Sequence, residues 1–130
     1  MNREDRFGCD HCWPESADGA WQMRSRLERR TELIDESHFR VMLLACNSCA
    51  QRFLSVFFES IDWEDGEDPQ AWTLIPITAT EESGLVKAGP ALVEALRSLG
   101  ADRRSLQRDY PKGRNPASCW GQGILVRPHD

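Results

Sequence analysis

The sequence predicts an α+β fold, with an antiparallel β-sheet first and one or two C-terminal helices after it. Two apolar runs between residues 39 and 61 have strand character, and a short polar turn separates them. The clearest helical spacing of apolar residues comes after residue 89. The 130 residues, 40% hydrophobic and 28% charged, fit a single soluble domain over residues 1–130. Within it we expect a β-sheet over residues 7–77 and a helical extension with a final strand over residues 78–130.

The two strongest strand predictions are Phe39–Ala45 and residues 52–61. Both runs are rich in β-branched and aromatic residues. In the second run apolar side chains occupy both alternating positions, which predicts a central strand with both faces covered. The turn between the runs is CNSC, so a hairpin closed by a cysteine-containing turn is expected.

Two further strands are predicted with weaker support. Residues 71–77 have strand composition, and Pro76 places them at an edge because proline lacks a backbone N–H. For residues 21–27 a strand is favoured, because Trp21 and the next apolar residues share one parity. Helical spacing also fits part of this stretch, so a helix stays open as the alternative.

The clearest helix prediction covers residues 90–99. Pro90 suits the first helical position, and Gly100 suits the stop. One apolar stripe runs along this segment, made of Leu92, Val93, Leu96 and Leu99.

A shorter helix is predicted next, capped by Asp102 and ended by Pro111. Its inward-facing residues would be Leu106 and Tyr110. A last strand is expected over residues 123–127.

Four of the five cysteines stand in two C-x-x-C pairs, with 33 residues between the pairs. In a chain without a recognisable secretory signal, such pairs favour metal binding over disulfides. Each tight turn brings two thiolates to one ion, and two turns complete the tetrahedral set that zinc prefers. Zinc is therefore the predicted metal and iron is less favoured, while buried free cysteines or redox thiols are the alternative. The predicted ligands are Cys9, Cys12, Cys46 and Cys49.

The first knuckle (residues 9–12, CDHC) and the second knuckle (residues 46–49, CNSC) together resemble a zinc ribbon or rubredoxin-like module. The resemblance covers residues 7–61 and lies at the level of the motif. It implies two knuckles that clamp one metal ion above a small antiparallel sheet.

The chain departs from that resemblance at two kinds of position. Trp13 and Ala50 stand just after the knuckles, where glycine often provides a positive φ. Asp10 and Asn47 stand where rubredoxins favour proline after the first cysteine. The second departure argues against an iron electron carrier.

Charge is unevenly distributed along the chain, whose formal net charge is −5. Residues 59–82 carry eight acidic and no basic side chains, and residues 83–130 carry eight basic and four acidic ones. An acidic protein is not typical of nucleic-acid binders, and two solvated surfaces of opposite sign are the favoured interpretation. No apolar run approaches the roughly 20 residues that span a bilayer. A cytoplasmic location is therefore expected.

Other candidate residues are judged non-functional or left open. His11 is expected beside the metal or in solvent, and His38 and His129 have no partner pattern. The acidic loop at residues 62–69 fails the calcium-loop template and is read as a solvated turn. Cys119 has no base or positive field near it in sequence, and its role is left open.

The functional prediction is a protein-interaction module built around a structural metal site. A closed metal site, no catalytic constellation and the acidic loop between Trp63 and Trp72 favour this over an enzyme. Most tryptophans are expected in the core, with these two the most exposed. A nucleic-acid-binding zinc ribbon is the first alternative, resting on a helical pair at residues 90–110 and on Arg97, Arg103, Arg104, Arg108, Lys112 and Arg114. A rubredoxin-like or thiol redox protein is the second.

Overall fold

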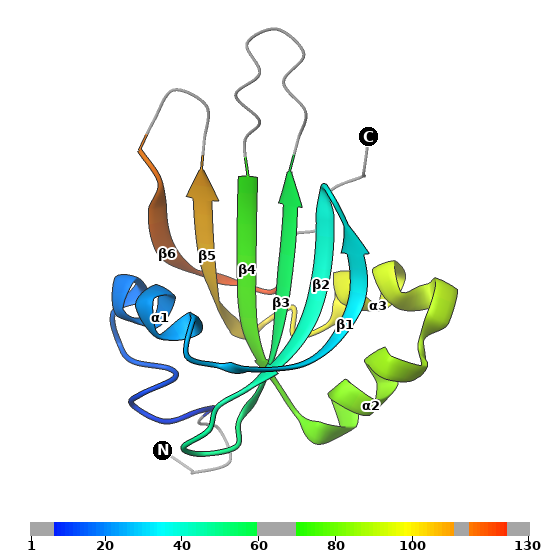
Figure 1. Ribbon diagram of the computed structural model, residues 1–130, viewed down its shortest axis with the longest axis horizontal. Coiled ribbons are helices and arrows are strands. Elements are labelled where there is room, and N and C mark those ends of the chain that lie inside the picture. The colour runs from blue at the N-terminus through cyan, green and yellow to red at the C-terminus, as the bar shows by residue number, and fades with distance from the viewer. Residues whose placement is uncertain (1–6, 60–69, 111–114, 125–130) are drawn as a thin grey trace, which may run out of the picture.

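The computed structural model describes residues 7–59, 70–110 and 115–124. These parts form α1 (Ala17–Arg24), β1 (Glu28–Glu36), β2 (Phe39–Ala45), β3 (Arg52–Glu59), β4 (Gln70–Ile77), α2 (Ala79–Lys87), the 3₁₀ turn η2 (Gly89–Ala91), α3 (Leu92–Ser98), β5 (Arg104–Tyr110) and β6 (Ala117–Gln122). The described strands form one six-stranded antiparallel sheet in the order β1-β2-β3-β4-β5-β6 (Figure 1). The predicted α+β class with an antiparallel sheet is confirmed. A helix also precedes the sheet, and two strands follow the C-terminal helices.

The sheet separates two apolar clusters, one on each face. On one face α2 and α3 bury Leu85, Leu92 and Leu96 against β2, β3 and β4. On the other face α1 and the first knuckle bury Ala20 and Cys12 against the sheet. The first knuckle is therefore part of the apolar packing on the α1 face.

The predicted hairpin of β2 and β3 is confirmed. The two strands pair in regular register from Phe39 with Phe58 to Ala45 with Arg52. Leu54 packs in the cluster under α2 and α3, whereas Phe53 packs in the cluster under α1. β3 thus has both faces covered, as its two-sided apolar pattern predicted.

β4 is confirmed as a strand, but its predicted edge position is wrong. It lies between β3 and β5, with pairing to β5 only from Gln70 to Leu74. Pro76 lies beyond the end of that ladder, and its carbonyl accepts a hydrogen bond of 2.9 Å from Arg103. Because N–H and C=O of one strand residue point to the same side, the missing N–H of Pro76 breaks no bond to β5.

The strand predicted at residues 21–27 is wrong, because α1 occupies most of it. The Ser16 hydroxyl caps the helix by accepting from the Gly19 backbone N–H at 3.1 Å. Ala20 then lies fully buried against the sheet. The alternation of Trp21 with the next apolar residues therefore arises by coincidence in a short helix and does not indicate a strand.

β1 was not predicted, because its sequence ERRTELIDE lacks an apolar alternation. It is an edge strand with a mostly exposed burial pattern and two register shifts against β2. Charges and bulges of this kind protect a sheet edge from pairing with another chain. Arg30 of β1 and Arg52 of β3 both approach the Glu82 carboxylate of α2, at 3.3 and 3.0 Å.

The predicted helix at residues 90–99 is present as η2 followed by α3. α2 before it was missed, although Thr78 and Glu81 form a complete capping box at its start. The spacing T-x-x-E in the sequence indicates such a capping box. Gly84 within the helix and the turn-like composition after it obscured that signal.

The predicted helix capped by Asp102 is wrong, since this segment is β5. Gly100, with φ of +58°, turns the chain after α3, and the Arg103 N–H closes the turn on the Gly100 carbonyl at 2.8 Å. Pairing with β4 then outweighs local helix propensity. Leu106 is buried, as expected, but from a strand.

β6 was not predicted, because its sequence ASCWGQ has little strand character. The last strand was instead expected over residues 123–127. In the structure Gly123 and Ile124 already lie beyond β6, and residues 125–127 lie outside the described part.

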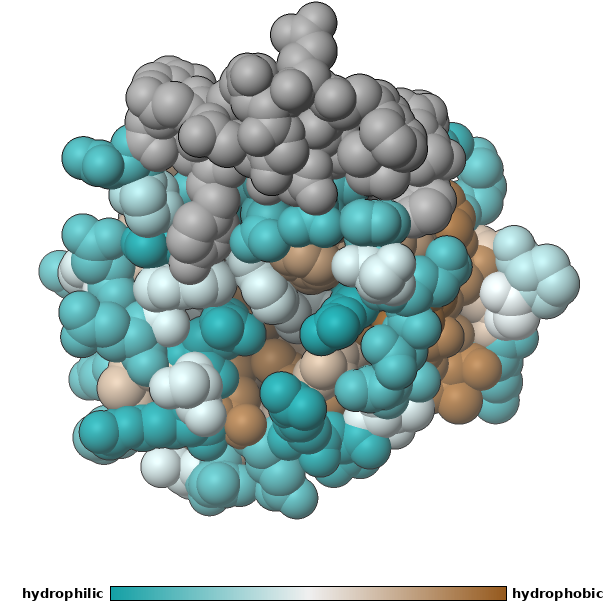
Figure 2. Space-filling model, turned by 45° about the horizontal axis from the view of Figure 1, so that its top comes forward, coloured by the Kyte–Doolittle hydropathy of each residue, from teal (hydrophilic) through white to brown (hydrophobic). Residues whose placement is uncertain are grey.

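The surface seen in Figure 2 is mostly hydrophilic, with hydrophobic side chains gathered at the right, the side of β1, α2 and α3 in Figure 1. Val86 of α2 is 55% exposed. Within the described residues, no helix has the length and apolar character needed to cross a membrane.

Candidate metal centre

The second knuckle is the turn of the β2–β3 hairpin. The Cys46 N–H bonds to the Gln51 carbonyl and the Ala50 N–H to the Cys46 carbonyl, both at 2.9 Å. The Ser48 N–H points at the Cys46 sulfur at 3.3 Å. Ala50 has φ of +66°, the one non-glycine residue with a positive φ in the described parts of the chain. The turn therefore keeps a left-handed position, although alanine stands where glycine is usual.

The first knuckle repeats part of this geometry outside the sheet. The Trp13 N–H bonds to the Cys9 carbonyl at 2.8 Å, as Ala50 does to Cys46 in the second knuckle. The Cys9 N–H lies 3.3 Å from the Cys12 sulfur. Here the positive φ, +71°, falls on Gly8 before the knuckle. A Cβ on that glycine would lie 2.8 Å from the Trp13 Cβ and 2.9 Å from the Cys12 sulfur.

The two knuckles bring all four cysteine sulfurs to one place. In Figure 1 the N-terminal segment lies beside the β2–β3 turn, at the bottom of the sheet. All four Sγ atoms lie within 4.8 Å of one another. The Sγ distances are 3.7 Å for Cys9–Cys12, 3.9 Å for Cys9–Cys46 and 3.7 Å for Cys12–Cys49.

These distances fit a shared metal ion. Zinc–sulfur bonds of about 2.3 Å at tetrahedral angles place two sulfurs about 3.8 Å apart. A disulfide would bring them to about 2.05 Å, and all the cysteines are free thiols. Four sulfur donors without an oxygen donor suit zinc or iron rather than magnesium or calcium.

The thiols differ in exposure and in acidity. Cys12 and Cys46 are buried, Cys9 is half-buried and Cys49 is exposed. Burial raises the pKa of Cys12, and burial is also the largest cause of the raised pKa of Cys49. Burial of Cys9 acts in the same direction, but backbone hydrogen bonds from Cys12 and His11 outweigh it and lower the pKa of Cys9 to about 7. Cys9 is therefore a thiol that readily supplies a thiolate at neutral pH.

A group of aromatic rings in tilted and edge-to-face contact connects the first knuckle to the sheet. The Trp13 ring lies 5.5 Å from Phe53 and 4.9 Å from Trp120 between centroids. The Trp120 Nε1–H donates to the Glu15 carbonyl at 2.7 Å, and the Arg104 guanidinium lies 3.9 Å from the Trp120 ring centre. The knuckle is thus held against β3 and β6 by packing as well as by its own turn.

Among the described residues, the other candidate residues do not belong to the four-cysteine group. His11 is exposed at the tip of the first knuckle and does not join the group. His38 pairs with Glu59 at 2.8 Å, and Cys119 is exposed on β6. His129 lies outside the described residues.

The prediction that most tryptophans pack in the core holds only in part. Trp13, Trp21 and Trp120 are half-buried and pack against the cluster under α1, and none of the described tryptophans is fully buried. Trp72 is half-buried, not exposed, because its ring lies 4.5 Å from Phe57 and 5.8 Å from Trp21. Trp63 and residues 62–69 of the acidic loop lie outside the described part of the chain.

Sequence reasoning missed two residues that organise the centre, Gly8 and Gln51. The Gln51 side chain accepts from the Gly8 N–H at 3.0 Å and so joins the two knuckles. A glycine directly before a C-x-x-C pair was a usable signal. A lone glutamine gives no indication of a partner 43 residues away.

No protein-family model matches the chain, and no curated protein or solved structure is significantly similar to it.

Proposed function

We propose that the chain binds one zinc ion through Cys9, Cys12, Cys46 and Cys49, in a structural site of zinc-ribbon type. The observation that carries the proposal is the convergence of the four Sγ atoms within 4.8 Å. Four thiolates complete the tetrahedron and leave no open position for a substrate, which is the mark of a structural zinc site. The ion would join the N-terminal segment to the central hairpin.

Metal content tests this proposal, measured on the purified chain by elemental mass spectrometry together with its visible spectrum. One zinc per chain and no colour support the structural site. Iron with a thiolate charge-transfer band would make the chain a rubredoxin-like protein instead. Absence of any bound metal after refolding with zinc would contradict the metal site and favour redox thiols in the two C-x-x-C pairs.

For the biological role, we propose a non-enzymatic module that binds another protein. The support is twofold: hydrophobic side chains gather on the side of β1, α2 and α3 (Figure 2), and Val86 of α2 is 55% exposed. Affinity capture with the wild type and with Val86→Asp tests this role. A partner retained only by the wild type supports it, and a partner set that is unchanged by the substitution contradicts it.

The nucleic-acid alternative has less support, because the helical pair on which it rested includes β5. Its arginines also make internal contacts: Arg103 pairs with Glu81 at 2.8 Å, and Arg108 donates to the Ser118 hydroxyl at 2.9 Å. Lys112 and Arg114 lie outside the described residues. Tight, strongly salt-dependent binding to mixed DNA or RNA would revive this alternative.

A further inference from the structure

The two halves of the metal centre have unequal support from the fold. The second knuckle closes the β2–β3 hairpin, and β2 and β3 also pair with β1 and β4. The first knuckle, residues 9–12, lies outside every helix and strand of the described chain. It therefore needs contacts beyond regular secondary structure to bring its two sulfurs to the other pair.

The Gln51 side chain provides such a contact by bridging the first knuckle to the end of the sheet. Its Oε1 accepts from the Gly8 N–H at 3.0 Å. Its Nε2 donates to the carbonyls of Arg52 at 2.9 Å and Ile77 at 2.8 Å. Only this orientation of the amide fits, because the oxygen faces a donor and the nitrogen faces two acceptors.

The anchored residue leaves the first knuckle little freedom. Gly8 directly precedes Cys9, and a Cβ at Gly8 would meet the Cys12 sulfur at 2.9 Å. The backbone of Gly8 thus lies against both cysteines of the knuckle. A hydrogen bond that fixes the Gly8 N–H consequently fixes where the two sulfurs stand.

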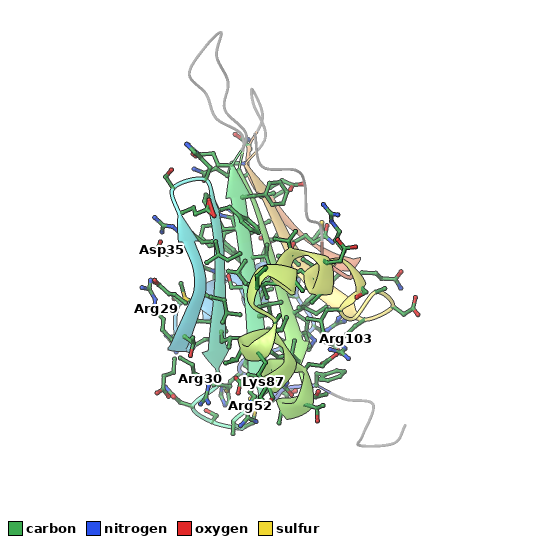
Figure 3. All side chains as sticks on the ribbon, turned by 90° about the vertical axis from the view of Figure 1, so that its right-hand side faces the viewer. Arg29, Arg30, Asp35, Arg52, Lys87 and Arg103 are labelled. Atoms are coloured by element: carbon green, nitrogen blue, oxygen red, sulfur yellow. The ribbon has the colours of Figure 1, made fainter. Side chains whose placement is uncertain are left out.

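A second contact also holds the segment before the first knuckle, but it does not fix the orientation of the backbone there. The guanidinium of Arg103, which is labelled in Figure 3, lies 4.6 Å from the Phe7 ring centre and pairs with Glu81 of α2. Stacking of a cation on a ring tolerates sliding and rotation far more than a hydrogen bond does. The packing of Trp13 on Phe53 and Trp120 also holds the first knuckle against the sheet, but ring contacts are less directional than hydrogen bonds. Gln51 is therefore the side chain whose hydrogen bonds set the direction of the backbone that enters the first knuckle.

We propose that Gln51 is a positioning residue of the metal centre, holding Gly8 so that Cys9 and Cys12 face Cys46 and Cys49 at metal-binding distance. This inference rests on the metal binding proposed above. Without the Gln51 amide, the incoming metal must itself order the first knuckle, so binding becomes weaker.

The test compares zinc affinities of full-length variants by competition with a chromophoric chelator. Gln51→Ala is expected to weaken zinc binding about 10- to 100-fold, the usual effect of removing a residue that supports metal ligands. Gln51→Asn keeps the amide but is one methylene shorter, so it cannot span from Gly8 to Ile77 and is expected to weaken binding as well. Because asparagine is polar and similar in size to glutamine, this variant is less prone than Gln51→Ala to lose affinity through general unfolding.

Gln70→Ala is the matched control. Gln70 lies at the opposite end of the same β3–β4 ladder, and its Nε2 donates to the Glu59 carboxylate at 2.7 Å. Its loss removes a comparable side-chain hydrogen bond far from the cysteines, so zinc affinity should stay at the wild-type value.

Site-specific alkylation of the zinc-loaded variants, mapped by mass spectrometry, separates positioning from general loss of stability. Relative to the wild type, Gln51→Ala should accelerate modification of Cys9 and Cys12 more than that of Cys46 and Cys49. Wild-type affinity in both Gln51 variants, an equal loss in Gln70→Ala, or equal acceleration at all four cysteines would overturn the proposal. A wild type that binds no zinc would contradict the proposed function itself, and the role of Gln51 with it.

Discussion

Ala50 occupies the left-handed region, with φ of +66°, at the point where the second knuckle joins β3. For a residue with a Cβ, this conformation costs about 1–2 kcal/mol relative to glycine. Ala50 adopts this conformation despite the cost, because its N–H donates to the Cys46 carbonyl and closes the turn of the second knuckle. The knuckle geometry therefore imposes local strain that the surrounding contacts outweigh.

Relief of that strain gives a prediction. Ala50→Gly should raise the free energy of unfolding by about 1 kcal/mol, because glycine adopts this φ without a steric clash. Denaturant unfolding of the zinc-loaded protein measures the change. The control is Ala88→Gly, at φ of −65°, where loss of the Cβ should destabilise. If both substitutions changed the free energy of unfolding in the same direction, strain at Ala50 would be contradicted.

At the scale of residues, the sequence pointed to the cysteines better than to their supports. The four cysteines follow from spacing alone, since C-x-x-C is a local pattern with a local geometric cause. Gln51 and Ala50 act through contacts that only the fold creates. Trp72 was expected to be exposed because of its acidic neighbours, but the rings of Phe57 and Trp21 cover it.

Helix α2 depends on a charged pair at its first turn. Burial acts to raise the pKa of Glu81, but hydrogen bonds and the charge of Arg103 outweigh burial and hold that pKa below its usual value. A carboxylate whose folded-state pKa is lowered stabilises the protein above its unfolded pKa, near 4.5. That stabilisation is lost as the pH falls through the folded-state pKa.

Glu81→Gln should therefore lower the free energy of unfolding at pH 7 by about 1.5 kcal/mol. The difference from wild type should shrink as the pH falls below 4.5, as denaturant titrations at several pH values would show. The matched control is Glu94→Gln, because Glu94 is 81% exposed and its pair with Arg97 should contribute almost nothing. A difference at Glu81 that persists unchanged at pH 3 would refute the ionic origin.

Helix α3 should contribute mainly by burial. Leu96 is fully buried in the cluster between α3 and the sheet. Leu96→Ala should destabilise by about 2–5 kcal/mol, through lost transfer energy and a cavity. Val86→Ala on the exposed face of α2 should change stability by less than about 0.5 kcal/mol. Thermal unfolding of the two variants side by side measures this contrast.

At the scale of elements, the strands and helices with many apolar residues were predicted, and those with few were not. The cores of β2, β3 and β4 and the stripe of α3 were predicted, because buried residues carry a periodic signal. β1 and β6 lie at the edges, where charge or small residues erase that signal. The assignments at α1 and β5 were reversed, since short segments with few apolar residues take the form that tertiary pairing and caps select.

For the whole molecule, the proposed metal would join parts that are distant in sequence. The first knuckle belongs to the apolar cluster with Leu44, Phe53 and Leu74 on the α1 face. The cluster under α2 and α3 contains no cysteine. Loss of the ion should therefore act first on one face of the sheet.

Hydrogen exchange after chelation tests this asymmetry. Amides of both knuckles and of α1 should lose protection, whereas those of α2 and α3 should retain more of it. Gross zinc-binding energies of about 10–16 kcal/mol are comparable to the stability of a small domain, so a large effect is expected. Uniform loss of protection over both faces would mean that the metal supports the whole fold.

The most direct test of the central claim is zinc stoichiometry in three proteins: the wild type, Cys46→Ser and Cys119→Ser. All three are refolded with zinc, desalted and measured by elemental mass spectrometry. The account predicts one zinc per chain in the wild type and in Cys119→Ser, whose exposed thiol lies outside the four-cysteine group. It predicts loss of tightly bound zinc in Cys46→Ser. Full zinc retention without the Cys46 thiol, or no zinc in the wild type, would contradict a shared four-cysteine site.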